Sequence, residues 1–516
     1  MIYKYNNFYE VLEENIKNYP KKVAYFVDNK KYYWMDVKKK VDTFARVLEL
    51  LGVKKEDKVP IFVKNSLEFI ISLLSIQKLG AVAVPINTFL KEEEVAYILN
   101  DINASLLIAS YDLRSSIKNI RKITNIKKII WEGDIKEVDE DNISFNEILT
   151  NFESHEAIKL PNINDIALII YTSGTTGKPK GAMLSYKNIF SNIYGINEIV
   201  QLTNKDRFIA YLPMFHSFTL TVNIFLPMFY GASVVIVRSI MPFKNIIKQT
   251  LLKRVTIFTG VPDIYSALSK AKLPFYFYWF NKVRFYISGA APLPKEVLNR
   301  FSKKFKTPLL EGYGLSETSP VVSVNRPNFQ KPSSVGKPLP NVEVKIVDEN
   351  LMEVEVGKEG EIIVKGDNVM IGYYNREDAT KESIINGWFL TGDIGKVDED
   401  GFIYILDRKK DLIISKGVNI YPREIEEICL QIKGIKECAV IGIKEKNEEI
   451  PVAFIELEDD VNITKEKIKN FLKQHLANYK IPKYIYFINE LPKNATGKVL
   501  KRKLREEIDK YKKLAI

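Results

Sequence analysis

The chain has 516 residues and carries 76 lysines and arginines against 64 aspartates and glutamates, a formal charge of +12. With 46% hydrophobic residues it is not intrinsically disordered, and its length predicts two or more globular domains. Two cysteines and three histidines are too few for a disulfide framework or a zinc ribbon. The first residues, MIYKYNNFYEVLEENI, lack the apolar core of a secretory signal, so we expect a cytoplasmic protein.

Short apolar runs alternate with longer amphipathic segments from residue 60 onward. Runs such as VPIFV, AVAVPI, IALIIYT and SVVIVR are typical of buried parallel strands, and residues 64–78 and 244–253 carry a helical pattern. This alternation predicts βαβ units stacked into doubly wound mixed sheets, an α/β fold with a large N-terminal domain.

Residues 208–237 contain no charged side chain and could imitate a membrane span. Pro213, Pro227 and Gly231 interrupt the segment and disfavour one continuous helix. We expect a strand, a loop, a helix of about 10 residues and a second strand, which is shorter than the roughly 20 residues that a bilayer requires. The segment is therefore predicted to be buried core.

The pattern changes after residue 335. VEVKIVDEN, GEIIVKG and GWFLTGDIGKVDEDGFIYIL have turn residues every few positions, which predicts a small β-rich subdomain of antiparallel hairpins. After DRKKDLIISKG the chain has its own set of strands and amphipathic helices. We expect an N-terminal domain over residues 1–407, a small mobile α+β domain over residues 408–516, and a short hinge between them.

A glycine- and threonine-rich stretch, YTSGTTGKPKG, occupies residues 171–181, after an apolar strand and before a helix that Ser185 could cap. Its three glycines, four hydroxyl side chains and two lysines supply N–H groups, O–H donors and cations, which suit a polyphosphate. The spacing excludes a Walker A loop, because two residues instead of four separate Gly174 from Gly177. Taken alone, the stretch is also typical of a solvated surface turn.

The stretch YTSGTTGKPKGAMLS resembles the signature of the adenylate-forming superfamily, which includes acyl-CoA synthetases, aryl-CoA ligases, amino-acid adenylation domains and firefly luciferase. The resemblance continues in order through ISGAAPL, EGYGLSET, GWFLTGDIG, DRKKDLIISKGVNIYP and PKNATGKVLKRKL. Several ordered motifs that span most of the chain are far more specific than one glycine-rich loop.

The resemblance implies an ATP site built from several of these motifs. Tyr313 would stack on adenine, and Thr318 would lie near the α-phosphate. Asp393 and Arg408 would contact the ribose. The implied ATP-binding residues are Thr172, Ser173, Gly174, Thr175, Thr176, Gly177, Lys178, Gly289, Ala290, Ala291, Glu311, Gly312, Tyr313, Gly314, Thr318, Asp393 and Arg408.

The same resemblance implies the catalytic groups. Lys498 would bridge the attacking carboxylate and the α-phosphate and offset charge in the transition state. Its neighbours Lys501 and Lys503 are expected to be solvated cations. Glu317, together with Thr172, would hold Mg²⁺, which prefers hard oxygen ligands.

His216 occupies the superfamily position beside the carboxylate pocket, where a steric and hydrogen-bonding role is implied. A single histidine between phenylalanines is also typical of a buried core. Amino-acid adenylation domains carry an aspartate there, so an α-amino acid would lack its counter-ion in this chain. Lys416 and Gly417 match the passage for the pantetheine arm of CoA, and Lys410 matches the hinge residue.

The implied reaction has two steps and uses ATP, Mg²⁺ and CoA. A carboxylate attacks the α-phosphate of ATP to give acyl-AMP and pyrophosphate, and a thiol then takes the acyl group. Because residues 213–237 are apolar and aromatic, we favour a medium- or long-chain fatty acid as the substrate. The alternatives are an acyl carrier protein in place of CoA, and an aryl acid such as a cinnamate or benzoate.

Two features leave further alternatives open. The charge of +12 is compatible with nucleic acid, although the chain has no arginine-rich arm, RNP pattern or zinc finger, and we expect no nucleic-acid partner. The run FYFYWF at residues 275–280 fits a peripheral contact with the inner face of a membrane, a contact with another subunit, or a buried aromatic layer. The oligomeric state is open, with a homodimer among the alternatives.

Overall fold

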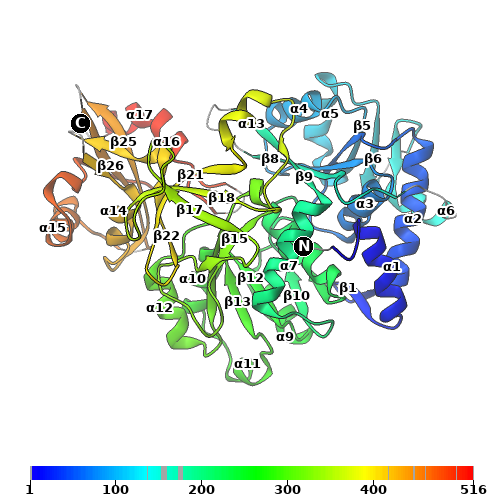
Figure 1. Cartoon of the computed structure of the whole chain (residues 1–516), viewed down its shortest axis with the longest axis horizontal. Coiled ribbons are helices and arrows are strands. Elements are labelled where there is room, and N and C mark those ends of the chain that lie inside the picture. The colour runs from blue at the N-terminus through cyan, green and yellow to red at the C-terminus, as the bar shows by residue number, and fades with distance from the viewer. Residues whose placement is uncertain are drawn as a thin grey trace.

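The computed structural model describes residues 3–135, 138–152, 160–172, 178–415, 418–445, 448–459, 461–494 and 497–514. Two large sheets with their helices form the main body, and the last hundred or so residues lie at one end of the molecule (Figure 1). This mixed α/β architecture confirms the predicted fold class. None of the helices among the described residues is long and apolar enough to cross a membrane.

The first sheet is parallel at its centre and antiparallel at one edge. Its strands in spatial order are β19 (Gly372–Tyr373), β9 (Lys180–Ser185), β8 (Ile166–Thr172), β4 (Val82–Pro85), β3 (Lys58–Phe62), β5 (Leu106–Ser110), β6 (Lys128–Glu132) and β7 (Asn142–Ser144). Neighbouring residues of β3 point to opposite faces, and both Ile61 and Phe62 are buried. Both faces are therefore covered, which explains the continuous apolar runs in the sequence.

Helices cover the two faces of this sheet. The helices around the first sheet are α2 (Trp34–Leu50), α3 (Leu67–Lys78), η1 (Tyr111–Leu113), α4 (Glu92–Asp101), α5 (Arg114–Lys122) and α6 (Phe145–Asn151). Buried residues of α2, α3 and α6 belong to the main hydrophobic core, and those of α4 and α5 to a second one. The predicted helix at 64–78 is confirmed, and it begins at Leu67 because Ser66 caps it.

The second sheet has the same doubly wound character. Its strands in spatial order are β16 (Lys337–Pro338), β15 (Val321–Val324), β14 (Leu309–Gly314), β13 (Phe285–Ser288), β12 (Ile257–Gly260), β10 (Arg207–Ala210), β11 (Ser233–Ile236), β1 (Val23–Val27) and β2 (Lys30–Tyr33). Its helices are α1 (Phe8–Asn18), α7 (Tyr186–Val200), α8 (Leu226–Phe229), α9 (Phe243–Leu252), α10 (Pro262–Lys270), α11 (Phe275–Phe280) and α12 (Lys295–Lys304).

Helix α7 ties the two sheets together. Ser185 caps it as predicted, because its hydroxyl accepts from the backbone N–H of Asn188. The Tyr186 hydroxyl donates to the carbonyl of Gln77 in α3, and the Asn192 amide donates to the carbonyl of Val321 in β15. Helix α7 is thereby bonded to an element of each of the two large sheets and their helices.

The uncharged segment 208–237 is buried core, as predicted. It forms β10, a helix and β11, and the first part of the helix, η2 (Thr219–Phe225), has π-helical hydrogen bonding. All residues of η2 are buried. π-Helical turns are rare and are found frequently at functional sites.

A smaller antiparallel sheet follows and confirms the predicted β-rich subdomain. It contains β17 (Glu343–Val347), β18 (Gly360–Lys365), β20 (Ile384–Ile385), β21 (Trp388–Val397) and β22 (Ile403–Arg408), with α13 (Glu377–Ser383) beside it. Strands β21 and β22 form a hairpin in which Asp393 lies opposite Arg408.

The C-terminal region has separate cores. Its elements are η4 (Lys409–Asp411), β23 (Ile413–Ser415), β24 (Val418–Ile420), α14 (Pro422–Cys429), β25 (Ile435–Glu445), β26 (Glu448–Leu457), α15 (Lys465–His475), η5 (Asn478–Lys480), β27 (Tyr484–Phe487), α16 (Lys501–Glu506) and α17 (Ile508–Leu514). Buried apolar residues from Ile413 onward form two clusters of their own, whereas Ile403 belongs to the main core. The hydrophobic core therefore divides between residues 405 and 413.

Candidate active site

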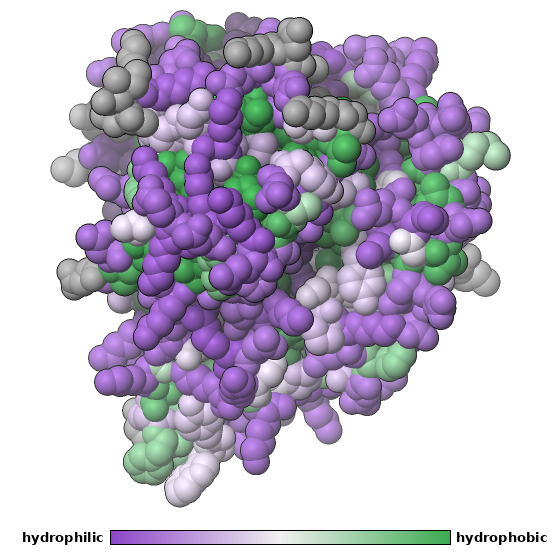
Figure 2. Space-filling model, turned by 90° about the vertical axis from the view of Figure 1, so that its left-hand side faces the viewer, coloured by the Kyte–Doolittle hydropathy of each residue, from purple (hydrophilic) through white to green (hydrophobic). Residues whose placement is uncertain are grey.

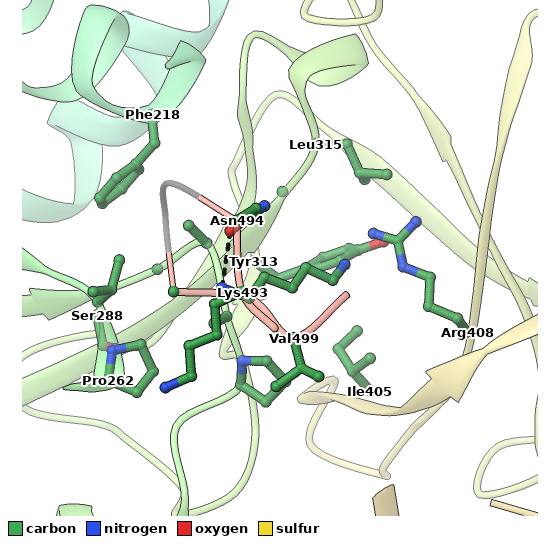
Figure 3. A pocket seen from close by; sticks show the side chains of 18 of the residues that line it. Phe218, Pro262, Ser288, Tyr313, Leu315, Ile405, Arg408, Lys493, Asn494 and Val499 are labelled. Carbon is green, nitrogen blue, oxygen red and sulfur yellow. Dashed lines mark hydrogen bonds between the residues drawn. The ribbon is translucent and has the colours of Figure 1, made fainter. Parts of the chain in front are cut away.

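A cavity of about 2440 Å³ lies where the two large sheets, the β-rich sheet and the C-terminal region meet. Figure 3 shows side chains from these parts around one space. Phe218, Ser288 and Tyr313 come from the second large sheet and its connections, Arg408 comes from β22, and Lys493 comes from the C-terminal region. The carboxyl ends of parallel strands contribute to its wall, which is the usual position of a ligand site in open α/β sheets.

The end of β14 contributes Glu311, Gly312, Tyr313 and Gly314 to the cavity wall. Gly314 has no room for a side chain, because a Cβ there would lie 1.9 Å from the carbonyl oxygen of Pro320. The close approach of the two chain segments thus requires glycine at this position.

Tyr313, Asp393 and Arg408 form one hydrogen-bonded group. The Tyr313 hydroxyl donates to Asp393 Oδ2 at 2.6 Å, and Arg408 Nε lies 2.6 Å from Asp393 Oδ1. Asp393 is 2% exposed. Burial lowers the pKa of the Arg408 guanidinium, but Asp393, Tyr313 and Glu317 together outweigh it, so the net pKa is raised. The site therefore contains a buried carboxylate that Tyr313 and Arg408 hold in position.

Glu317 lies in the short helix η3 (Ser316–Thr318), which follows β14. Its Oε1 accepts from the hydroxyls of Thr172 at 3.3 Å and Tyr373 at 3.0 Å. The carboxylate is nearly buried and lines the cavity. The two predicted metal-binding residues are thus in direct contact, although they are far apart in the chain.

Thr318 is not among the described residues that line the cavity, and its place near the α-phosphate stays a prediction. Its hydroxyl donates to the carbonyl of Pro320 at 2.6 Å and is fully buried within the turn. Ser316 lines the cavity instead, and its hydroxyl lies 2.9 Å from that of Ser217. The sequence motif does not single out Ser316, because nothing in the polar turn Ser316–Thr318 indicates which of its two hydroxyl groups faces the cavity.

The small residues after β13 line the cavity as the motif predicted. A Cβ at Gly289 would lie 3.1 Å from the Phe218 ring, and Ala290 has a left-handed φ of 67°. Ser288 was not predicted. Its buried hydroxyl has no hydrogen-bond partner among the described residues, and it lines the same cavity. An unpaired buried hydroxyl at a cavity wall is available to a ligand.

Lys498 reaches the cavity from a tight turn of the C-terminal region. The turn is closed by hydrogen bonds from Asn494 N to Lys498 O and from Lys498 N to Asn494 Oδ1, both 2.9 Å long. Burial between the domains, together with the nearby Arg408 charge, lowers the pKa of the ammonium group to about 8. The side chain remains accessible from within the cavity.

Neighbouring lysines differ from this arrangement. Lys501 pairs with Glu426 at 2.8 Å and its side chain is only 15% exposed, so the expectation of a solvated cation is wrong there. Lys503 is exposed, as expected.

Ion pairs hold the C-terminal region against the main body. Lys493 lies 3.2 Å from Asp263 of α10 and 2.6 Å from Glu437 of β25. Lys270 pairs with Glu458 at 2.6 Å. Of these pairs, Lys493–Asp263 and Lys270–Glu458 join the two parts, and both are partly exposed, so each contributes little free energy.

His216 lines the cavity beside Phe215 and Phe218. Burial lowers its pKa to about 4, and its Nδ1 accepts the backbone N–H of Phe218 at 3.3 Å. The imidazole is therefore neutral at pH 7, and Nε2 carries the proton. A neutral N–H donor is available for a ligand oxygen.

Glu311 is another cavity residue with a shifted pKa. Burial raises the pKa of its carboxyl group to about 7, and the nearby Arg423 charge reduces the shift only in part. Its Oε1 accepts the backbone N–H of Leu293 at 2.9 Å. The side chain thus supports the loop after β13.

Some predicted residues lie outside the described part of the chain: Ser173, Gly174, Thr175, Thr176, Gly177, Lys416 and Gly417. The residues that flank the first stretch, Thr172 and Lys180, line the cavity. Lys178 is exposed, and its ammonium group lies 5.8 Å from the centre of the Tyr97 ring.

Two family models match the chain. The AMP-binding enzyme model matches residues 12–374, and the model of the AMP-binding enzyme C-terminal domain matches residues 424–498. Together they contain most of the residues around the cavity.

Curated proteins and solved structures resemble the chain over almost its whole length. A long-chain-fatty-acid–CoA ligase of Escherichia coli O6:H1 is 32% identical, covering 98% of this chain and 95% of the relative. A 2-succinylbenzoate–CoA ligase of Geobacillus sp. is 35% identical, covering 95% of each. The crystal structure of an anthranilate CoA ligase in complex with anthranoyl-AMP has a TM-score of 0.91 at 28% identity, covering 98% of each chain.

Proposed function

Because the chain belongs to the AMP-binding enzyme family and is an AMP-forming acid–CoA ligase, we propose that its acid substrate is a medium- or long-chain fatty acid. The relatives act on both fatty and aryl acids according to their names, so the choice depends on the acid-binding part of the cavity.

The apolar part of the cavity carries this proposal. Ile196 and Val200 of α7 and Val222 of η2 line it, and each is at most 5% exposed. Ile196 and Val200 are one helical turn apart, so this wall extends for about 6 Å along α7. A wall of aliphatic side chains suits an alkyl chain. Neutral His216 could donate to the carboxylate at the polar end.

A panel of acids tests this assignment. We expect the kcat/KM for decanoate to palmitate to exceed that for benzoate or 2-succinylbenzoate by about 10-fold or more, since each buried methylene contributes to binding. The measurement is acid-dependent AMP release with CoA, repeated with a phosphopantetheine carrier protein. A preference for an aryl acid would overturn the fatty-acid assignment, and AMP release only with the carrier would overturn CoA as acceptor.

A matched pair of variants locates the alkyl chain. Val222→Phe narrows the apolar wall and should shift the preferred acid toward shorter chains, because the added ring occupies the same space. Val222→Ala keeps the space open and should leave long acids as substrates. If both variants retain the wild-type chain-length profile, the alkyl chain lies elsewhere.

In the first half-reaction, we propose that the acid carboxylate attacks the α-phosphate while Lys498 offsets the developing negative charge. Tyr313 would stack on adenine, and Asp393 would accept hydrogen bonds from the ribose hydroxyls, with Arg408 holding the carboxylate in place. Ser316 and Ser288 are additional candidates for contacts with ATP or the acyl group. A bond forms between the acid oxygen and the α-phosphorus, the α–β phosphoanhydride bond breaks, and pyrophosphate leaves while acyl-AMP stays in the site.

Mg²⁺ fits the donors that the chain provides. No cluster of three or more acidic, histidine or cysteine ligands occurs among the described residues. A single buried carboxylate, Glu317, beside the Thr172 hydroxyl suits an ion that takes most of its ligands from phosphate oxygens and water. Bound there, Mg²⁺ would neutralise charge on the triphosphate.

The second half-reaction requires a different face of the C-terminal region. The thiol of CoA must reach the acyl carbon that Lys498 faces during adenylation. We propose that residues 408–516 move as a domain about Lys410, so that Lys416 and Gly417 then line the path of the pantetheine arm.

Replacing Asp393 tests the ribose contact. Asp393→Ala should raise the KM for ATP by about 10- to 100-fold, because each hydrogen bond to a charged group contributes roughly 1.5–3 kcal/mol. The measurement is the initial rate against ATP concentration at saturating acid. Asp398→Asn is the control, since this residue lies on the same hairpin but pairs with Lys331 at the surface. Unchanged ATP titration in Asp393→Ala would mean that the ribose binds elsewhere.

A further inference from the structure

Helix α11 carries a cluster of exposed aromatic side chains. In Figure 1 it lies at the lower extremity of the molecule. The exposed residues are Phe275 (72%), Tyr278 (44%), Trp279 (73%) and Phe280 (60%). Such a dense exposed aromatic cluster is unusual for a soluble surface and indicates an interaction site.

The cluster is held firmly from beneath. Phe277 is 2% exposed, and its ring centre lies 6.2 Å from that of Phe305 after α12. Asn281 ends the helix, donating its backbone N–H to the Phe277 carbonyl at 2.8 Å. Lys304 donates to the carbonyls of Leu268, Ser269 and Ala271, which holds the C-terminal end of α10, from which the chain leads to α11. Phe277 therefore anchors the helix, whereas Phe275, Trp279 and Phe280 are exposed.

Positive charge surrounds the aromatic cluster. Residues 270–306 contain nine lysines and arginines and one acidic residue, Glu296, although Lys270 pairs with Glu458 and Arg284 pairs with Asp206. Lys272 and Lys282 are exposed and flank α11 on either side in the chain. In Figure 2 the lowest projection of the visible face is green and pale, with purple side chains above it. This projection corresponds to the low position of α11 in Figure 1.

We propose that α11 and its flanking lysines dock the protein onto an anionic phospholipid bilayer. Tryptophan, tyrosine and phenylalanine are favoured at the level of lipid headgroups, where the rings leave water and their polar atoms stay hydrated. Lysines close to the surface add attraction to anionic lipid. If two copies of the chain met through this face, the lysines of one copy would lie against those of the other. This repulsion disfavours a dimer through the same face.

The helices that precede and follow α11 in the chain both contribute to the cavity wall. Lys270 at the end of α10, and Arg300 and Lys303 of α12, line that cavity, and these two helices flank α11 in the sequence. Docking would bring this part of the cavity wall close to the bilayer, where fatty acids partition. This consequence rests on the proposed fatty-acid substrate, whereas bilayer binding itself does not.

Binding to vesicles tests the proposal without any substrate. The full chain should sediment with vesicles of about 30% phosphatidylglycerol in phosphatidylcholine and much less with phosphatidylcholine alone. Phe275→Ser with Trp279→Ser should lower the partition coefficient by about 10-fold or more. The double variant Lys272→Glu with Lys282→Glu should lower the partition coefficient to a similar extent, and about 0.5 M salt should weaken vesicle binding by the wild type.

Two control variants should bind vesicles like the wild type. One is Met352→Ser, at an exposed apolar residue elsewhere, and the other is Lys465→Glu with Lys467→Glu in α15.

Tryptophan fluorescence gives a second readout. Trp34 and Trp131 are buried, so Trp279 is the most exposed of the four tryptophans. Its emission should shift to the blue on anionic vesicles, and Trp279→Phe should abolish that shift while retaining sedimentation. Equal sedimentation of wild type and both double variants would overturn the proposal. If the protein does not bind vesicles but forms a dimer in solution, and the Phe275 and Trp279 substitutions abolish that dimer, the surface binds a second copy of the chain instead. Retained acid-dependent AMP release shows that the variants are folded.

Discussion

Lys498→Ala is expected to lower acid-dependent pyrophosphate exchange by about 100-fold or more, the scale for losing a preorganised charge at a developing negative centre. The turn that carries Lys498 directs its ammonium group into the cavity near Arg408 and Asp393. Thioester formation from chemically prepared acyl-AMP should persist, because the adenylate is already formed. Exchange of pyrophosphate at the wild-type rate would refute this role.

Lys503→Ala is the matched control, because Lys503 is an exposed lysine five residues further on. It should leave both half-reactions within about twofold of wild type, since an exposed cation in water contributes little. A comparable loss in this control would point to the overall charge of the C-terminal region, not to one ammonium group.

The pH dependence follows from the same lysine. A lysine acts as a cation below its pKa, and the pKa of Lys498 lies at about 8. The kcat/KM for ATP should therefore fall as pH rises through about 8, because this ratio reports ionisation in the free enzyme. Lys498→Arg keeps the charge throughout this range, so the residual activity of that variant should lose the alkaline decline.

Lys410→Pro should stop thioester synthesis from acid, ATP and CoA while pyrophosphate exchange persists. The residues on either side of Lys410 are held by different bodies: Lys409 pairs with Glu361 of β18 at 2.7 Å, and Asp411 pairs with Arg505 of α16 at 2.7 Å. Rotation between these bodies must therefore involve the backbone of Lys410. Proline fixes φ near −65° and restricts that rotation without removing a reacting group.

Lys410→Ala separates loss of charge from loss of rotation, and both half-reactions should continue in this variant. The two half-reactions are followed separately, as pyrophosphate exchange and as thioester formation. If Lys410→Pro lowers both in parallel, or neither, the chain does not turn about this residue.

Local features of the sequence were sufficient for much of the fold. The β21–β22 hairpin was predicted from turn residues, and its register brings Asp393 opposite Arg408. The strands of the large sheets and the cap at Ser185 were also predicted. Hydrophobic periodicity and helix capping depend on residues that are close in the chain, so both can be recognised in the sequence. The motifs likewise identified Lys498 and Glu317 as cavity residues before any contact was known.

Contacts between distant residues were decided only by the tertiary structure. Tyr313 reaches Asp393 across 80 residues, and Lys493 reaches Asp263 across 230. Thr318 turns its hydroxyl inward while Ser316 faces the cavity, because the turn at Ser319 has left-handed backbone and Pro320 accepts the bond. The sequence predicted polar residues at this point but not their directions.

The aromatic run at residues 275–280 shows the same limit. Every position is aromatic, so periodicity cannot separate an inward face from an outward one. Packing of Phe277 against Phe305 buries one ring and leaves Phe275 and Trp279 in solvent. Burial depends on which distant surface a side chain meets, and the folded chain alone supplies that surface.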